Sequence, residues 1–161
     1  MNNRKRLMYS ILMYVFTSGV KRTKFLKKHN IFGSIGKNVM MQSRSLPLNP
    51  ECVFIGDNVR CASGVIFITH DVAHHMLNNM NLNMHFSEKI GEIHIGDNVF
   101  IGANSIIMYD VTIGSNVIIG AGSVVVNDIP SDTVCVGVPC KPVKDFHSFV
   151  EKRKDAVIDN M

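Results

Sequence analysis

The sequence predicts a mainly β protein built as a parallel β-helix, with helical segments at both ends. Three observations predict it: a six-residue repeat from Ile95 to Pro130, a break in that repeat between Phe67 and Ile93, and helical spacing of apolar residues near the N-terminus. The length of 161 residues supports a single domain. A composition with 46% hydrophobic and 19% charged residues is typical of a folded globular protein.

The repeat reads IGDNVF, IGANSI, IMYDVT, IGSNVI, IGAGSV and VVNDIP. An aliphatic residue opens every hexad, and the fifth residue of one hexad lies two positions before the first of the next. Side chains such as Val117 and Ile119 therefore share one face of a strand. Gly, Asn and Asp between these pairs tolerate turn conformations. Each hexad is thus a short strand plus a corner, and its apolar face can be buried only when successive coils stack.

Weaker copies of the motif lie upstream, in Ile35-Gly36-Lys37-Asn38-Val39 and Ile55-Gly56-Asp57-Asn58-Val59. Together with IGAGSVVVNDIP and the following VGVPCKPV, these repeats resemble the hexapeptide-repeat acyltransferases, and within them the galactoside, maltose and xenobiotic acetyltransferase branch. The resemblance runs from about Ile35 to Lys144. It implies a left-handed parallel β-helix with three hexads in each coil, and a homotrimer with active sites between subunits.

The predicted organisation has three parts. Residues 1–30 form an N-terminal helical arm, and residues 31–144 form the β-helix, from which a loop at 71–92 protrudes. Residues 145–161 form a C-terminal tail with a short helix from Asp145 to about Asp159.

Charge is divided unevenly along the chain. Residues 1–50 contain ten basic and no acidic side chains, whereas the chain from Glu51 onward contains seven basic and thirteen acidic ones. The net charge of +4 is therefore the sum of +10 in the first segment and −6 in the second. An acidic body excludes a uniformly basic nucleic-acid binder. The four cysteines have no metal-motif spacing, which favours a reduced, cytoplasmic compartment.

The arm contains an apolar stretch from Leu7 to Val20 that is too short to cross a bilayer, which takes ~20 residues. Six of its apolar residues recur at helical spacing: Leu7, Met8, Ile11, Leu12, Val15 and Phe16. Two interpretations stay open. The helix packs on its own domain, or it contacts the inner face of a membrane as a peripheral surface helix.

The break in the repeat is the candidate site of chemistry. Ile55 and Ile95 are 40 residues apart, which is not a multiple of six, so an insertion must loop out of the coils. Long loops in a tight fold are more often functional than idle. The insertion begins with Thr69-His70-Asp71 and continues with His74, His75 and Asn78.

In the branch that the sequence resembles, a Thr-His pair at this place carries the catalytic base, which implies His70. An imidazole can take the proton of an acceptor hydroxyl and return it to the leaving thiolate. The resemblance implies an O-acetyltransferase with acetyl-CoA as co-substrate, direct transfer in a ternary complex, and no metal. Asp71, His74, His75 and Asn78 are candidate contacts for the acceptor, expected to be a sugar or saccharide of the kind used for cell-surface polysaccharides.

The resemblance also implies an acetyl-CoA groove lined by small residues and closed by cations. These positions are Ala103, Ala121, Val126, Asn127, Lys141 and Lys144. Two positions depart from the branch: Gly64 stands where an Asn contacts the acceptor sugar, and Phe100 replaces a Trp. The departures put the identity of the acceptor in doubt, and an amine acceptor also stays open.

Two other classes remain open. The γ-type carbonic anhydrases share the β-helix and bind zinc through three histidines, for which His70, His74 and His75 are candidates. Their spacing does not place ligands on successive coils, because no histidine occurs between Ile95 and Val125. A non-catalytic β-helix scaffold is the other alternative.

Overall fold

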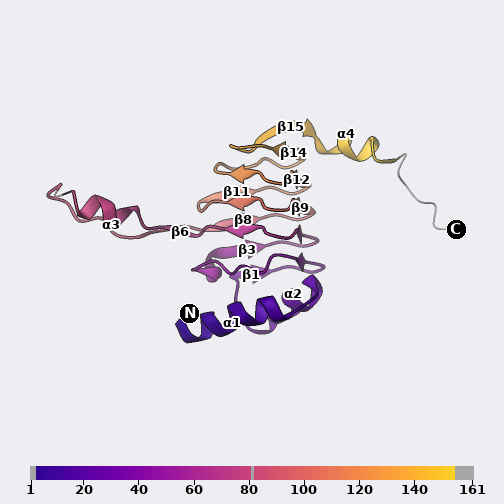
Figure 1. Cartoon of the computed structure of the whole chain (residues 1–161). Helices are drawn as coiled ribbons and strands as arrows, with labels where there is room; N and C mark the ends of the chain where they lie inside the picture. Colours follow the sequence, from indigo (N-terminus) through magenta and orange to yellow (C-terminus); the bar gives the residue numbers. More distant parts are fainter. Residues whose placement is uncertain (1–2, 81, 155–161) are drawn as a thin grey trace.

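The computed structural model describes residues 3–80 and 82–154 of the chain. Short strands wind into flat coils that stack as a column (Figure 1). Two helices lie across one end of the column, and an antiparallel strand pair and a short helix close the other (Figure 1).

The strands form three sheets that run along the column. Sheet A consists of β1 (Ser34–Ile35), β3 (Val53–Ile55), β8 (Ile93–Ile95) and β11 (Val111–Ile113). Sheet B consists of β2 (Met40–Met41), β4 (Arg60–Cys61), β9 (Val99–Ile101), β12 (Val117–Ile119), β14 (Thr133–Val136) and β15 (Lys141–Asp145). Sheet C consists of β5 (Ile66–Phe67), β10 (Ile106–Ile107) and β13 (Val124–Val125). Every pairing within these sheets is parallel except that of β14 with β15.

The strand register confirms the predicted coil. In sheet B, Ile119 pairs with Ile101, and in sheet A, Ile113 pairs with Ile95, each an offset of 18 residues or three hexads. Across the break the offset grows to 40 residues, as between Ile55 and Ile95, so one coil carries 22 extra residues. The insertion leaves the stacking of the coils above and below it intact.

The core is a narrow column of aliphatic side chains from the first and fifth positions of the hexads. Both serines at a fifth position, Ser105 and Ser123, are buried as well, and both donate their hydroxyl hydrogens to the Gly120 carbonyl oxygen, at 3.0 and 2.7 Å. Because buried hydroxyls need a partner, this shared acceptor explains how Ser replaces Val in the column.

One corner of the coils is held by a ladder of asparagine side chains. Asn58, Asn98 and Asn116 all have positive φ angles, of 54°, 57° and 56°. The side-chain amide of each donates to the next member of the ladder, at 2.9 Å for the first two bonds and 2.8 Å for the bond from Asn116 to Asp132. Asn tolerates the left-handed conformation better than other side chains, so the corner selects this residue.

The N-terminal segment forms two helices, α1 (Asn3–Val15) and α2 (Gly19–Lys28), instead of one helix continuing to Val20. Arg22 holds the turn between the two helices in place, because it is buried and donates to the carbonyl oxygens of Phe16, Met41 and Gln42. The Arg22 guanidinium thereby connects the turn between the helices, at the Phe16 carbonyl, to β2, at the Met41 carbonyl. The helices are therefore a fixed cap on the first coil.

The C-terminal helix α4 spans Phe146–Glu151, shorter than the predicted stretch from Asp145 to about Asp159. Asp145 caps it by accepting a hydrogen bond of 2.8 Å from the Ser148 amide. None of its residues is buried, so no packed apolar face supports further turns. Residues 155–159 of the predicted helix lie outside the described residues.

Candidate active site

The inserted loop leaves the column on a two-stranded stem. β6 (His70–Asp71) pairs antiparallel with β7 (Lys89–Ile90), and the helix α3 (Ala73–Asn78) lies beyond the stem. The loop projects sideways from the middle of the column (Figure 1). Thr69 anchors the stem, because it is fully buried, its carbonyl accepts from the Gly91 amide at 3.0 Å, and its hydroxyl accepts from the Asn49 amide at 3.2 Å. His70 is thus the first side chain outside the core.

The imidazole of His70 is half-buried at the base of the stem. Its Nδ1 atom is enclosed and has no hydrogen-bond partner among the described residues, and the same holds for Nδ1 of His74. Enclosed polar atoms in proteins are nearly always hydrogen-bonded. Within the described part of the chain, neither Nδ1 atom therefore has the hydrogen-bond partner that an enclosed polar atom ordinarily has.

Asp71 occupies the centre of a small polar cluster. Its Oδ2 accepts a hydrogen bond of 2.6 Å from the Tyr109 hydroxyl, and its Oδ1 accepts one of 3.0 Å from the Ala73 amide. These two bonds, the stronger from Tyr109, hold the pKa of Asp71 below its ordinary value, and the nearby His74 and His70 act in the same direction. The hydrogen bond to Asp71 in turn raises the pKa of Tyr109.

Tyr109 is a further candidate site residue, which the sequence pattern did not single out. It follows β10 on the coil to which the loop is attached, and the adjacent Lys89 and Asp110 form an ion pair of 2.6 Å. The Lys89 ammonium also lies 5.8 Å from the centre of the Tyr109 ring. The only available signal was the hexad IMYDVT, in which Met and Tyr replace the usual Gly and small residue.

The other predicted loop residues differ in their surroundings. His75 is exposed on α3, with its ring centre 4.1 Å from that of His74. The Asn78 amide group donates to the Phe86 carbonyl at 2.9 Å and accepts from the Phe86 amide at 2.8 Å. Asn78 thus closes the loop on itself, and its contact with an acceptor stays a prediction, as does that of His75.

The small residues predicted to line the acetyl-CoA groove lie at the corner between sheets B and C. Ala103 is half-buried and Ala121 is exposed, and they occupy equivalent positions in successive coils, joined by a 2.8 Å bond from the Gly122 amide to the Ala103 carbonyl. The coils approach closely here: a Cβ atom on Gly102 would lie 2.4 Å from the Ala121 nitrogen. The corner therefore presents backbone and methyl groups directly to its surroundings.

Val126 and Asn127 lie at the other edge of sheet C, after β13, and both are exposed. They are one coil above Tyr109, since the Met108 amide donates to the Val125 carbonyl at 3.0 Å. Lys141 and Lys144 are on β15 at the end of the column, the first exposed and the second half-buried. Burial lowers the pKa of Lys144, and the neighbouring Lys152 adds to the effect.

Within one chain, the predicted residues lie apart: Val126 and Asn127 are on the same edge of sheet C as Tyr109, and the two lysines are on β15 of sheet B. His70, Asp71 and His74 cluster with Tyr109 on one edge of sheet C, whereas the two alanines lie on its opposite edge. Among residues 3–80 and 82–154, no group of three or more His, Cys, Asp or Glu side chains is placed to hold a metal ion.

The family model described as bacterial transferase hexapeptide (six repeats) matches residues 92–127. A solved maltose O-acetyltransferase from Clostridium difficile 630 is 31% identical to this chain, with a TM-score of 0.65, and the match covers 88% of this chain and 86% of that one. The chain belongs to the bacterial hexapeptide transferase family. The left-handed parallel β-helix that the resemblance implies is confirmed by the parallel coils and by the match to this family.

Other known proteins are also similar to this chain. Protein CapG from Staphylococcus aureus is 42% identical over 103 residues, which are 64% of this chain and 58% of CapG. The galactoside O-acetyltransferase of Escherichia coli (strain K12) is 38% identical over 114 residues, 70% of this chain and 54% of that protein. A solved galactoside acetyltransferase in complex with coenzyme A is 28% identical, with a TM-score of 0.63, and 92% of this chain and 84% of that chain are covered. The chain spans just over half of the length of the two curated relatives.

Both departures from the hexapeptide transferase branch lie away from the His70 cluster. Gly64 has a φ angle of +73° at the corner between sheets B and C, and a Cβ atom there would lie 2.0 Å from Oδ1 of Asn104. Phe100 is exposed on the outer face of sheet B, between Arg60 and Ile118 of the neighbouring coils.

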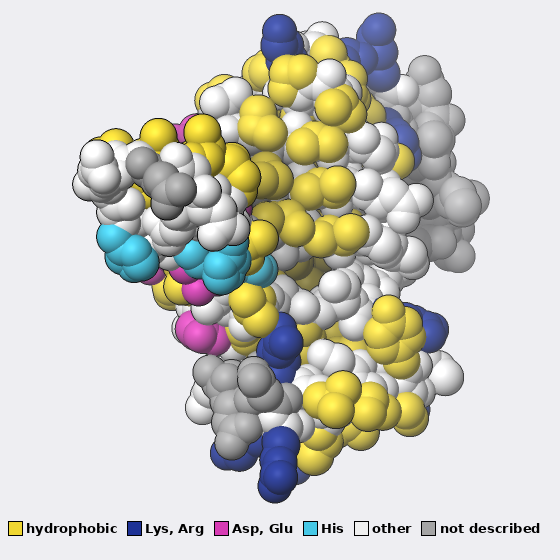
Figure 2. All heavy atoms as spheres, turned by 60° about the vertical axis from the view of Figure 1, so that its left-hand side comes forward, with side chains coloured by type: hydrophobic (Ala, Val, Ile, Leu, Met, Phe, Trp, Pro, Cys, Tyr) yellow, Lys and Arg dark blue, Asp and Glu magenta, His cyan; other side chains and the backbone are white. Residues whose placement is uncertain are grey.

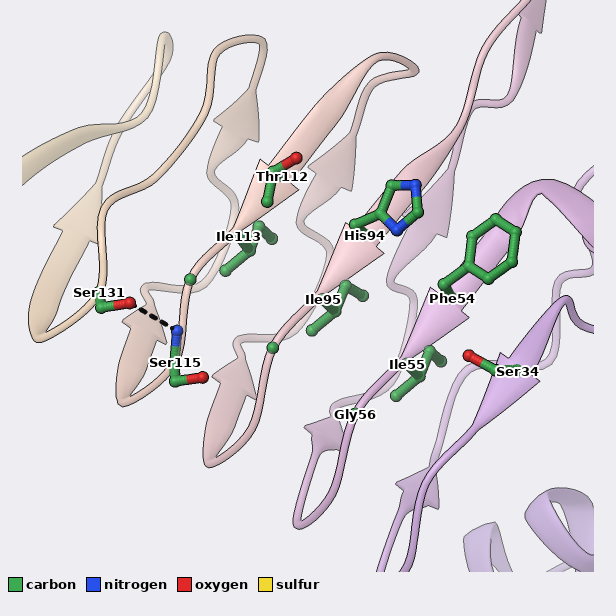
Figure 3. Close-up of a pocket in the computed structure, with 12 residues that line it drawn as sticks. Ser34, Phe54, Ile55, Gly56, His94, Ile95, Thr112, Ile113, Ser115 and Ser131 are labelled. Atoms are coloured by element: carbon green, nitrogen blue, oxygen red, sulfur yellow. Dashed lines mark hydrogen bonds between the residues drawn. The ribbon is translucent and has the colours of Figure 1, made fainter.

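A separate shallow groove of about 400 Å³ follows the outer face of sheet A. Figure 3 shows Ser34, Phe54, His94 and Thr112 in a row across neighbouring strands. The rings of Phe54 and His94 are stacked, with centres 4.6 Å apart and an interplanar angle of 3°, and His94 Nε2 lies 2.8 Å from Glu92 Oε2. The groove contains none of the residues predicted to bind or react.

Proposed function

We propose that this protein transfers an acetyl group from acetyl-CoA to a hydroxyl of a saccharide, with His70 as the general base. The observation that carries the proposal is the position of His70, fixed on a stem at the edge of the column, with an enclosed Nδ1 that has no partner among the described residues. The names of the relatives, maltose and galactoside O-acetyltransferases, support the reaction class.

The proposed reaction is a direct transfer. His70 removes the proton from the acceptor hydroxyl while the hydroxyl oxygen attacks the thioester carbonyl carbon. A carbon–oxygen bond forms, the carbon–sulfur bond breaks, and the thiolate takes the proton from the imidazolium. Since a thiolate is a good leaving group, the chain need not supply a nucleophile of its own.

Asp71 and Tyr109 are positioning residues in this proposal. The Tyr109 hydroxyl binds Asp71, which lies on the same strand as His70. This bond connects the strand to the coil directly below Asn127. A small displacement of a catalytic group lowers the rate strongly, so a fixed stem is an advantage. His74 and His75 face the acceptor from α3, and Asn78 holds the loop that carries them.

Acetyl-CoA fits the exposed corner at Ala103 and Ala121, where no large side chain keeps the pantetheine arm from the backbone. Lys141 and Lys144 supply cations for its phosphates at the end of the column. Val126 and Asn127 follow β13 on the opposite edge of sheet C, one coil above Tyr109, and are the co-substrate contacts proposed on that edge. The solved galactoside acetyltransferase contains coenzyme A, which supports this co-substrate.

The two groups of residues on opposite edges of sheet C support a homotrimer. We propose that the His70 cluster of one subunit meets the alanine corner of its neighbour, so that each site is completed between subunits. The expected mass in solution is three times the 17.9 kDa of one chain. A monomer with full turnover would contradict this arrangement.

Thiol release from acetyl-CoA, measured with a panel of saccharides and amines, tests the reaction. We expect release with a saccharide and, for His70→Ala, a loss of about 10²–10⁴-fold in kcat with acetyl-CoA binding retained. His94→Ala, on the outer face of sheet A, is the matched control and keeps its turnover. Turnover by His70→Ala would reject His70 as the base, and an intact protein that does not bind acetyl-CoA would reject the transferase itself.

A further inference from the structure

The helix α1 is apolar on two opposite faces. The inner face contains fully buried Met13, which belongs to the same core as the coils, and partly buried Tyr9, Leu12 and Phe16. The rings of Tyr9 and Phe16 contact the ring of Phe25 on α2. The outer face carries five large apolar side chains, each 48–65% exposed: Leu7, Met8, Ile11, Tyr14 and Val15. The six residues predicted to form one stripe are thus divided between two faces.

The outer side chains form one continuous strip. With 3.6 residues in each turn, these five residues lie within an arc of about 120°. A surface helix normally shows polar side chains on the side away from the core. A contiguous exposed apolar strip instead marks a contact surface.

The surroundings of the strip are cationic. Residues 1–50 contain no acidic side chain. Lys5 on α1 and four lysines on α2 are exposed, namely Lys21, Lys24, Lys27 and Lys28. Figure 2 shows hydrophobic and basic side chains next to each other at the base of the molecule, where the two helices lie.

We infer that the outer face of α1, together with the lysines of α2, docks this protein on an anionic phospholipid bilayer. Apolar side chains beside lysines and without acids are the combination that enters the boundary between headgroups and acyl chains. The lysines attract anionic headgroups, while Tyr14 combines an apolar ring with a hydroxyl suited to the boundary. A second copy of the chain is the competing occupant, because residues from Glu51 onward carry a net charge of −6.

The contact is with the surface of the bilayer. In the part of the chain that the structure describes, no helix has the length and hydropathy needed to cross a membrane. α1 has 13 residues, about 20 Å, and lies across the base of the column (Figure 1). Docking by this face leaves the inserted loop on the flank of the column, away from the bilayer, so membrane binding and acetyl transfer can be tested separately.

Deletion of residues 1–30 would be a clean test of membrane docking only if these residues were an arm separate from the fold. They are not separate from it. Met13 and Leu26 belong to the same core as the coils, and Arg22 and Thr23 hydrogen-bond to the backbone of β2. Deletion therefore uncovers the first coil, and a loss of binding could follow from unfolding. Substitutions of outward side chains avoid this problem.

Co-sedimentation of the full chain with vesicles tests the inference. At about 100 mM salt, we expect binding to phosphatidylcholine vesicles containing 30% phosphatidylglycerol and little binding to phosphatidylcholine alone. Leu7→Ser/Ile11→Ser is expected to weaken the binding by at least about 10-fold, since two inserted side chains are lost. Lys21→Gln/Lys24→Gln is expected to weaken it by a similar factor and to reduce its salt dependence.

The matched control is Leu48→Ser/Val150→Ser, which removes two apolar side chains exposed elsewhere and should bind as the original protein does. Circular dichroism and light scattering establish the fold and the mass of each variant. Absence of vesicle binding by the intact protein, or equal binding by Leu7→Ser/Ile11→Ser, overturns the inference. A smaller oligomer in that variant also overturns it, because the strip is then a contact between copies.

Discussion

The Tyr109 hydroxyl donates a hydrogen bond of 2.6 Å to Asp71 Oδ2, and this bond connects the inserted loop to the coil on which it stands. The two residues are 38 positions apart in the chain. Asp71 directly follows His70 on β6, so the contact restrains the strand that presents the proposed base. The same hydrogen bond lowers the pKa of Asp71 and raises that of Tyr109, so both shifts move the pKa further from neutral pH.

Removal of this hydroxyl is expected to affect catalysis more than folding. In Tyr109→Phe, kcat should fall about 10-fold while the Kd of acetyl-CoA is unchanged, because the stem of the loop loses a restraint on His70. The pKa of Asp71, followed by carbon-13 NMR of its carboxyl group, should rise. Tyr14→Phe, an exposed tyrosine on α1, is the control. An unchanged kcat together with an unchanged pKa would show that the bond does not position the stem.

The pH dependence of the loop follows from the direction of the two pKa shifts. The pKa of Asp71 is lowered in the folded protein, so its contribution to stability is present above the ordinary carboxyl pKa of about 3.9 and is lost as the pH falls through the lowered value. The pKa of Tyr109 is raised, so its contribution is lost only as the pH rises through a value above about 10.

Backbone amide exchange of β6 and β7 should therefore show the same protection from about pH 5 to pH 9, once corrected for intrinsic rates. A loss of protection centred near neutral pH would mean that a different group controls the stem. Tyr109→Phe serves as the control, since its protection should be lower throughout this range.

The column should be sensitive to truncation of inward side chains and insensitive to that of outward ones. Ile113 is 1% exposed, and Ile113→Ala is expected to lower the free energy of unfolding by about 2–5 kcal/mol. Thr112→Ala, on the exposed face of the same strand, should change it by less than about 0.5 kcal/mol. Urea denaturation measures both, and equal effects would contradict the inward position of Ile113.

The thiol of Cys61 should be inert in the folded protein. It is fully buried, and burial raises its pKa to about 12. We expect a thiol reagent at pH 8 to leave Cys61 unmodified until the protein unfolds, whereas half-buried Cys52 reacts first, although its pKa is also raised. Peptide mapping after labelling identifies the modified residues, and rapid labelling of Cys61 with an unchanged circular dichroism spectrum would contradict its burial.

The coils could be predicted because their signal is local and repeated. Each hexad contains its own strand and its own corner. The strand positions of Val117 and Ile119 and the corner position of Asn116 can therefore be predicted without knowledge of distant residues. The insertion was also visible, since Ile55 and Ile95 are out of step by a number that six does not divide. The resemblance placed the candidate base, His70, at the start of that insertion.

Contacts between distant segments could not be predicted in the same way. In the sequence, Tyr109 is only an irregular residue of a hexad. Its contact with Asp71 becomes visible only when the structure places β6 beside its coil. Arg22 is one of ten cations in residues 1–50 and nothing in the sequence sets it apart, yet it is buried and binds the turn between α1 and α2. The two hydrogen bonds between the Asn78 amide group and the Phe86 backbone likewise have no signal in the sequence.

The sequence by itself determined the stacked coils, the aliphatic column, the place of the insertion and the uneven charge, because all of these depend on short-range pattern and composition. The tertiary structure alone decided which face of α1 is buried, what holds Asp71, and which predicted site residues share an edge of sheet C. These features depend on which surfaces meet after the coils have stacked. Helical spacing shows that a helix is apolar, whereas only the packing of Met13 and Leu26 on the first coil shows which apolar side chains are left outside.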